Sequence, residues 1–173
     1  MKKFQTLTAA ALMLFAFATS SNAQSTAYST ATATLLTPIS IAKNTDLHFG
    51  TLAASATAGT VVLDYADGRT KTGGVKLLTG TSAEKTAVFT VTGEGTNTFS
   101  ISIPSSISLS DGATHSMTIN GLTCDEGTSS QLSSGTKVIK VKGTLVVSAN
   151  QSAGVYTNTA TDNTGLYVTV NYN

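Results

Sequence analysis

The chain has few features that would cross-link a small domain or mark it as an enzyme. Its 173 residues include one cysteine, two prolines and no tryptophan, and only 11% of them are charged. Because Cys124 has no second cysteine to pair with, the fold cannot depend on an internal disulfide bond. His48 and His115 are the only histidines, and neither lies in a recognisable catalytic motif.

Charge is also too sparse for nucleic-acid recognition. The one mild basic group, Lys137, Lys140 and Lys142, alternates with valine and isoleucine along a single expected strand. A surface that binds nucleic acid requires a denser basic strip. Threonine, serine, asparagine and glycine carry the polarity instead, a composition that suits a protein of the outer surface.

The N-terminus has the pattern of an export signal. Lys2 and Lys3 precede an apolar run over residues 7–18, which is shorter than the roughly 20 residues of a membrane-spanning helix. Small residues then precede a cleavage site between Ala23 and Gln24. We therefore predict a helical signal peptide over residues 1–23 and no membrane span after its removal. The protein is expected in the periplasm, at the cell surface or in the secreted fraction of a Gram-negative bacterium.

The residues after the signal predict an all-β fold in a single domain, residues 24–173. Threonine and valine favour strands, and glycine, asparagine, aspartate and serine interrupt them at short intervals. The expected strands are 31–41, 47–52, 60–65, 75–78, 87–92, 98–103, 107–109, 117–119, 138–147 and 165–173. Gly143 is expected at a bulge in its strand, and Asp67-Gly68 in a hairpin turn. This spacing predicts an antiparallel, immunoglobulin-like β-sandwich, with a closed barrel as the alternative.

The last nine residues alternate most clearly. Leu166, Val168, Val170 and Tyr172 share one face, while the residues between them are mostly polar. A terminal strand of this kind frays unless it pairs within a sheet. We therefore predict that these four side chains pack on the core.

No catalytic or metal-binding signature is present in the sequence. There is no nucleophile elbow, zinc-binding helix motif, phosphate-binding loop or Cys-x-x-Cys pair. The stretch Gly93-Glu94-Gly95 is interpreted as a turn, and Asp67 and Asp162 occupy expected turns without the spacing of a calcium loop. The sequence therefore predicts a protein that is not an enzyme and has no cofactor or metal.

Several weak motifs occur together in one order. They are residues 37–41 (TPISI), 46–50 (DLHFG), 89–94 (FTVTGE), 99–104 (FSISIP), 143–147 (GTLVV), 149–151 (ANQ), 154–156 (GVY) and 167–173 (YVTVNYN). This set resembles the bacterial secreted family known as domain of unknown function 4402, with residues 160–165 as a lengthened turn. It is more distantly similar to spore-coat-U-type and archaic chaperone–usher pilus subunits, which share the early Phe-Gly pair and the alternating terminal strand.

The second resemblance implies a mode of assembly. Those pilus subunits are immunoglobulin-like sandwiches that lack one strand, which a periplasmic chaperone and then the next subunit supply. Leu166, Val168, Val170 and Tyr172 would then form the strand that borders the vacant position. The donated segment would come from residues 24–30 or 30–36, and a sandwich complete in itself is the alternative.

These observations lead to one expected function and one rival. The first is a non-catalytic structural or adhesive surface protein, a pilin-like subunit whose partners are itself or related subunits and a periplasmic chaperone. The rival is a monomeric secreted module that binds a glycan or a host protein.

Overall fold

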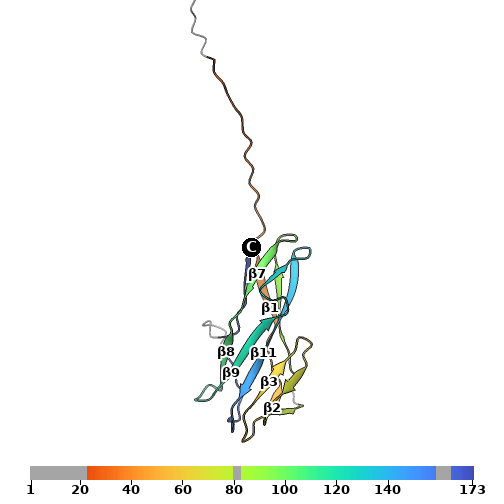
Figure 1. The fold of residues 1–173 in the computed structure, drawn as a ribbon, viewed down its shortest axis with the longest axis vertical. Coiled ribbons are helices and arrows are strands. Elements are labelled where there is room, and N and C mark those ends of the chain that lie inside the picture. Colours follow the sequence, from red (N-terminus) through yellow and green to blue (C-terminus); the bar gives the residue numbers. More distant parts are fainter. Residues whose placement is uncertain (1–22, 80–82, 159–164) are drawn as a thin grey trace, which may run out of the picture. The chain divides into compact units, whose positions relative to one another are not determined.

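A computed structural model describes residues 23–79, 83–158 and 165–173, in which all regular structure is β-strand (Figure 1). The predicted signal peptide, residues 1–23, lies outside these ranges except for Ala23. The predicted turn at 160–165 lies outside them except for Gly165. Among the described residues, no helix is long and apolar enough to cross a membrane. The chain divides into two units, residues 1–35 and residues 36–173, and the second contains every strand of the described residues.

The larger sheet has seven antiparallel strands. In order across the sheet it contains β1 (Ser40–Thr45), β6 (Ala87–Thr92), β11 (Thr136–Val147), β3 (Gly59–Leu63) and β4 (Arg69–Lys71). On the other edge of β11 lies β9 (Ser116–Cys124), which also pairs with β8 (Ser106–Ser110). The long β11 therefore pairs with β6 and then β3 along one edge and with β9 along the other.

Two smaller sheets complete the fold. The first consists of β10 (Ser129–Gln131), β7 (Thr98–Ser102) and β12 (Thr169–Tyr172), in that order. The second is the pair β2 (Thr51–Ala53) and β5 (Lys76–Leu78). Within the described residues β1 pairs only with β6 and β12 only with β7, so these edges leave the sheets open. The predicted all-β, antiparallel β-sandwich is confirmed, and the closed barrel is not the architecture of the described strands.

The core lies between the sheets and is built mainly from alternate residues of β3, β6, β7, β8, β9 and β11. Val91 of β6, Ile139 and Val141 of β11, and Phe99 of β7 have no exposed surface. Successive side chains of a strand leave opposite faces, so the residues between them face outward. Thr86 is the one buried polar residue among those described.

The alternation of apolar and polar residues predicted the positions of several strands correctly. The strand at 87–92 has the predicted bounds, and those predicted at 98–103 and 138–147 differ only at their ends. The pairing of β11 with β9 shifts register between Lys142 and Thr144, which confirms the bulge predicted at Gly143. A Cβ at that position would lie 2.7 Å from Ile119 Cγ2, so the close approach excludes a side chain.

The hairpin turn predicted at Asp67-Gly68 is confirmed, since it joins β3 to β4. Asp64 Oδ1 accepts hydrogen bonds from the backbone N–H groups of Ala66 and Gly68, both at 2.8 Å. Asp67 itself has a φ of 67°, in the left-handed region that aspartate tolerates better than most residues.

The strand predicted over 31–41 is wrong for most of its length. Regular structure begins only at Ser40, and Leu35 is 99% exposed. The alternation of threonine and alanine satisfies the strand pattern but provides little apolar surface to bury. Pro38 also lacks the N–H that a ladder needs. The strand predicted over 47–52 is reduced to β2 from Thr51, because Gly50 takes a φ of 71° before it.

Candidate assembly edge

The terminal strand β12 forms one end of the three-stranded sheet. It pairs antiparallel with β7, from Thr169 opposite Ser102 to Tyr172 opposite Phe99. All four predicted residues lie against the core. Val170 is 9% exposed, and Leu166, Val168 and Tyr172 are partly buried. The strand itself is shorter than predicted, because Leu166 and Val168 precede its first paired residue.

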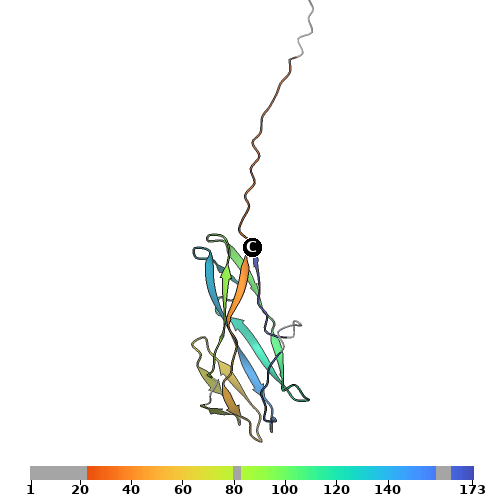
Figure 2. The same cartoon turned by 180° about the vertical axis from the view of Figure 1, so that it is seen from behind.

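Strand β1 forms the corresponding end of the larger sheet. Ile39, Ile41 and Leu47 lie on or beside it, and each is only partly buried against the core. Figure 2 shows β1, in orange, beginning beside the chain's C-terminus, where β12 ends. Strand β1 starts at this end and β12 finishes at it, so the two strands are antiparallel. No ladder joins them among the described pairings.

These two unpaired edges have the chemistry of a site that accepts a strand. In an antiparallel ladder, alternate residues direct their N–H and C=O groups away from the neighbouring strand. Strand β12 uses only the side that faces β7. The apolar side chains beside both edges stay partly exposed, whereas the inward residues of β6 and β11 are fully buried. An added strand could satisfy the backbone groups and cover these side chains.

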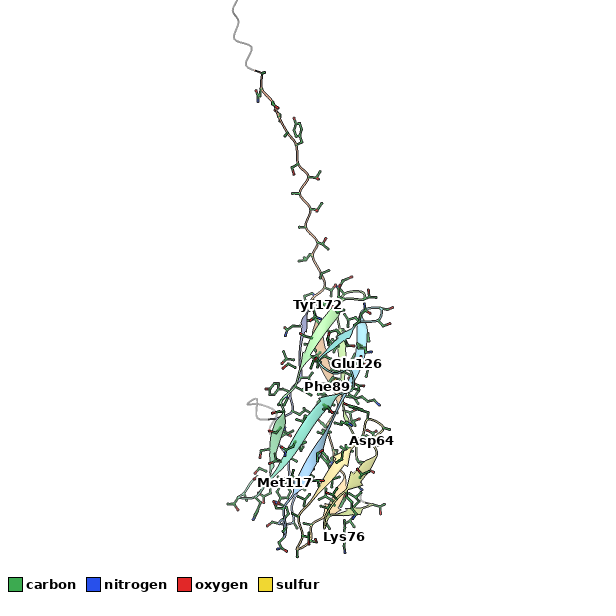
Figure 3. All side chains as sticks on the ribbon, in the orientation of Figure 1. Asp64, Lys76, Phe89, Met117, Glu126 and Tyr172 are labelled. Atoms are coloured by element: carbon green, nitrogen blue, oxygen red, sulfur yellow. The ribbon has the colours of Figure 1, made fainter. Side chains whose placement is uncertain are left out.

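A hydrogen-bonded cluster links the two edges at one end. The Tyr172 hydroxyl accepts the backbone N–H of Glu94 at 2.6 Å and donates to the carbonyl of Thr37 at 2.9 Å. Thr37 Oγ1 donates in turn to Glu94 Oε2 at 2.6 Å. We call Thr37, Glu94 and Tyr172 the Tyr172 lock. Figure 3 shows Tyr172 at the end of the sandwich opposite Lys76.

Gly93 provides the space that the Tyr172 hydroxyl occupies. A Cβ on Gly93 would overlap the Tyr172 hydroxyl, so only glycine leaves room for this oxygen. Sequence reasoning identified Gly93 and Glu94 only as a turn and Tyr172 only as a core residue. The partners are separated by 78 and 135 residues along the chain, and no local pattern could have joined them.

The N-terminal unit offers an exposed extended segment. Residues 23–35 contain no regular structure, and all of them are exposed. Tyr28 and Leu35 expose nearly their whole side chains. Ala31, Ala33 and Leu35 occupy alternate positions with threonines between them, and Ala27 lies four residues before Ala31. In an extended conformation these apolar side chains would share one face.

Cys124 has no reactive character. Its side chain is buried, and burial raises the pKa of its thiol to about 11. The thiol therefore stays protonated at neutral pH, whereas a nucleophile or metal ligand needs the thiolate. No cluster of three histidine, cysteine or acidic residues suitable for a metal ion occurs in the described part of the chain.

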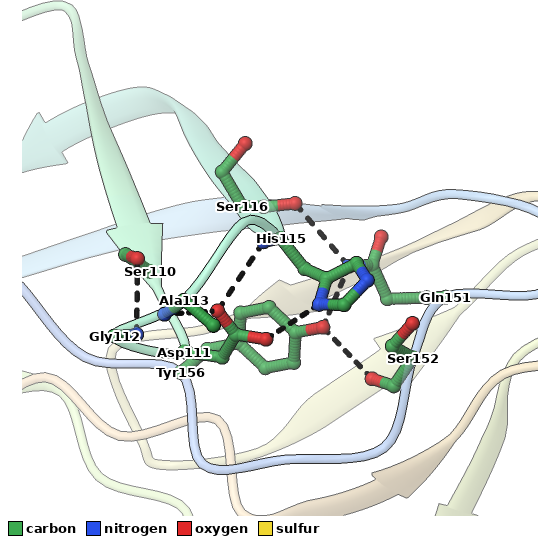
Figure 4. A network of polar contacts seen from close by, with 9 residues as sticks. All are labelled: Ser110, Asp111, Gly112, Ala113, His115, Ser116, Gln151, Ser152 and Tyr156. Atoms are coloured by element: carbon green, nitrogen blue, oxygen red, sulfur yellow. Dashed lines mark hydrogen bonds and ion pairs between the residues drawn. The ribbon is translucent and has the colours of Figure 1, made fainter.

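The hairpin between β8 and β9 contains a carboxylate–imidazole pair (Figure 4). Asp111 Oδ2 lies 2.6 Å from His115 Nδ1, and Asp111 Oδ1 accepts the backbone N–H groups of Ala113 and His115. The Ala113 N–H, followed by His115, lowers the pKa of Asp111. These bonds cap the turn, as aspartate side chains commonly do.

A second set of contacts fixes the loop that follows β11 beside this hairpin. Gln151 Nε2 donates to the Tyr156 hydroxyl at 2.8 Å and to the Ser116 carbonyl at 3.3 Å. The Tyr156 hydroxyl donates to the Ser152 carbonyl at 2.8 Å (Figure 4). In the described contacts no serine hydroxyl bonds to the His115 ring, so the network supplies loop order and not a nucleophile–base pair.

The carboxylate of Asp67 predicts how stability depends on pH. Its Oδ1 accepts the backbone N–H of Thr86 at 2.8 Å and its hydroxyl at 2.9 Å, and Lys85 Nζ lies 2.9 Å from Oδ2. The Thr86 N–H, followed by Lys85, lowers the pKa of Asp67 from 3.8 to about 2. A lowered pKa adds stability above pH 3.8 that is lost as the pH falls towards 2. The pKa values of Asp111 and Glu126 are lowered in the same direction.

We therefore expect Asp67→Asn to lower the free energy of unfolding at pH 7 by about 1 kcal/mol, with a difference that shrinks below pH 4. Urea unfolding between pH 2 and 7 measures this. Asp46→Asn, which removes an exposed carboxylate paired only with Lys43, is the control. An Asp67→Asn protein that keeps the wild-type pH profile would contradict the assignment.

Comparisons with known proteins identify a family. Neither the curated proteins nor the solved structures gave a significant match to the chain. The profile of one family matches residues 39–172, a range that contains all twelve strands and excludes the exposed segment 23–35. The chain therefore belongs to the family described as Domain of unknown function (DUF4402), as the order of its motifs predicted.

Proposed function

We propose that the protein is an exported, non-catalytic structural or adhesive subunit of the bacterial surface, joined to other copies by strand addition at the free edge of β12. The observation that carries this proposal is the pair of unpaired edges, β12 and β1, whose apolar side chains remain partly exposed. An exposed strand edge beside such side chains tends to aggregate unless another strand covers it.

The strand that fills this edge is residues 24–36 of a second copy. At about 3.3 Å per residue, this segment is long enough to run past the whole of β12. Its exposed Leu35, and Leu36, which is 45% exposed, provide apolar surface that the segment does not bury itself. The alanines bury little area, so backbone hydrogen bonds to β12 supply much of the stability of the joint.

A chaperone belongs to the same proposal. Between export and assembly, the free edge of β12 would be open to uncontrolled pairing with other strands. A periplasmic chaperone that adds a strand of its own to this edge would prevent this until the next subunit replaces it. The proposed location is the periplasm followed by the cell surface.

Deleting residues 24–36 tests the function. The full chain, exported with its own signal, should run as a ladder of oligomers in cold detergent and as monomer after boiling. The deletion variant should run as monomer at both temperatures and melt at the same temperature as wild-type monomer, below that of the oligomers. Val155→Ser, which removes another exposed apolar side chain, should keep the ladder.

Two results would oppose the proposal in different ways. A single monomer band from the full chain, with no filaments by electron microscopy, would favour the monomeric binding module. Loss of soluble protein on deletion would mean that residues 24–36 belong to the sandwich of their own copy.

A further inference from the structure

We propose that the Tyr172 lock is a stop that sets the register of the added strand. This inference rests on the proposed function and concerns how the joint is built. Strand addition through the backbone alone specifies register weakly, because each shift by two residues returns the same face to the core. A segment of alternating threonine and alanine is especially prone to such slippage, since its positions resemble one another.

The Tyr172 lock bridges the free edges of β12 and β1 at one end of the sandwich. The hydroxyl of Tyr172, at the end of β12, is bonded to the carbonyl of Thr37, which precedes β1. It is also bonded to the backbone of Glu94, which follows β6. These bonds connect both layers of the sandwich at this end. A strand that lies along β12 meets the lock after Asn171 and cannot continue between the edges.

The direction of the added strand follows from the ladders already present. Every named ladder in the described strands is antiparallel. Strand β12 runs towards the lock, so an antiparallel partner begins at the lock and runs away from it. The first paired residue of the incoming segment therefore lies beside Tyr172, and the register is counted from there.

Gly93 makes the stop rigid. Because it has no Cβ, the Tyr172 hydroxyl can sit directly against its backbone, with Glu94 N–H as donor and the Thr37 carbonyl as acceptor. A hydroxyl with both roles satisfied is costly to displace. The same position can be disturbed in two ways, by removing the hydroxyl in Tyr172→Phe or by filling its seat in Gly93→Ala.

Disulfide trapping between copies measures the register. In a Cys124→Ala background, one cysteine replaces Asn171 on the outward face of β12. A second cysteine replaces, one variant at a time, an alternate residue of the segment, at position 26, 28, 30, 32 or 34. With the lock intact, one of these five positions should give nearly all of the cross-linked oligomers.

Tyr172→Phe and Gly93→Ala should both raise the cross-linking at neighbouring positions by about tenfold, the change expected for the loss of one or two hydrogen bonds. The control Tyr167→Phe, on the same terminal segment outside the lock, should leave the wild-type pattern. A melting curve for each variant confirms that the domain is folded.

The outcomes separate the two proposals. If the wild type cross-links at one position and both lock variants keep that position alone, the stop is overturned and strand addition stands. If the wild type cross-links equally at all five positions, the stop is likewise overturned. If no position cross-links, the added strand itself is overturned, and the stop with it.

Discussion

Replacing Arg69 by methionine is expected to lower the free energy of unfolding by about 3 kcal/mol, because it removes several hydrogen bonds from a charged group at a partly buried site. The side chain is 8% exposed and lies among backbone carbonyls. Nη1 donates to Phe49 O at 2.8 Å and to Thr51 O at 2.9 Å, and Nη2 donates to Leu78 O at 2.7 Å. Methionine would leave the part-buried carbonyls of Phe49 and Thr51 without this donor and would also remove the exposed bond to Leu78 O.

The loss is large because Arg69 holds separate parts of the fold together. It lies on β4, in the larger sheet, while its partners belong to or adjoin β2 and β5. Its Nε is also 3.4 Å from Glu84 Oε1, a carboxylate that would lose its partner. Lysine should not rescue the variant, because one ammonium group cannot reproduce the planar fork of the guanidinium.

Urea denaturation of Arg69→Met, Arg69→Lys and wild type measures this effect. Lys71→Met is the matched control, since it removes an exposed cation from the same strand. Its effect should stay within about 0.5 kcal/mol, as is usual for surface substitutions. Equal midpoints for Arg69→Met and Lys71→Met would show that the carbonyl contacts contribute nothing.

Phe99→Ala should be comparably destabilising, by about 3–5 kcal/mol, because it leaves a large cavity between the sheets. Phe99 has no exposed surface and is the largest of the fully buried side chains described. In the ladders of β7 it stands opposite Ser130 of β10 and Tyr172 of β12. A cavity here would therefore weaken the support of β12 as well as the core.

Thr98→Ala is the control for this substitution, since Thr98 is the exposed neighbour on the same strand. Thermal unfolding of the two variants should give a melting temperature far below wild type for Phe99→Ala and close to it for Thr98→Ala. Similar melting temperatures would mean that the two sheets close up around the missing ring.

Alternation in the sequence predicted the fold where one face of a strand is apolar and the other is not. Strands β6 and β7 follow this rule, because each covers the core with one face. The buried residues are Ala87, Phe89 and Val91 in β6 and Phe99 and Ile101 in β7. It failed at β4 and β10, two three-residue strands that contain only polar or charged residues. Backbone pairing forms both strands: β4 pairs with β3 across the Asp67-Gly68 hairpin, and β10 pairs with β7, which lies much earlier in the chain.

The candidate edge was predicted only in part. Alternation placed Leu166, Val168, Val170 and Tyr172 against the core but could not show that β12 has a single neighbour. The hydroxyl of Tyr172 forms hydrogen bonds with the backbone of Thr37 and Glu94. The sequence around Thr37 predicts a strand and that around Glu94 a turn, so neither indicates this contact. Arg69 is the only arginine of the chain, and a guanidinium, with its five donors, suits a site that is lined by several carbonyls.

The buried thiol of Cys124 has a consequence for where the protein can mature. With a single cysteine, held inside and kept protonated, the domain offers no substrate to enzymes that make or reshuffle sulfur bridges. Because no intramolecular disulfide can form, we expect the native sandwich to reach the same stability with and without a reductant, which urea unfolding in the two conditions would measure.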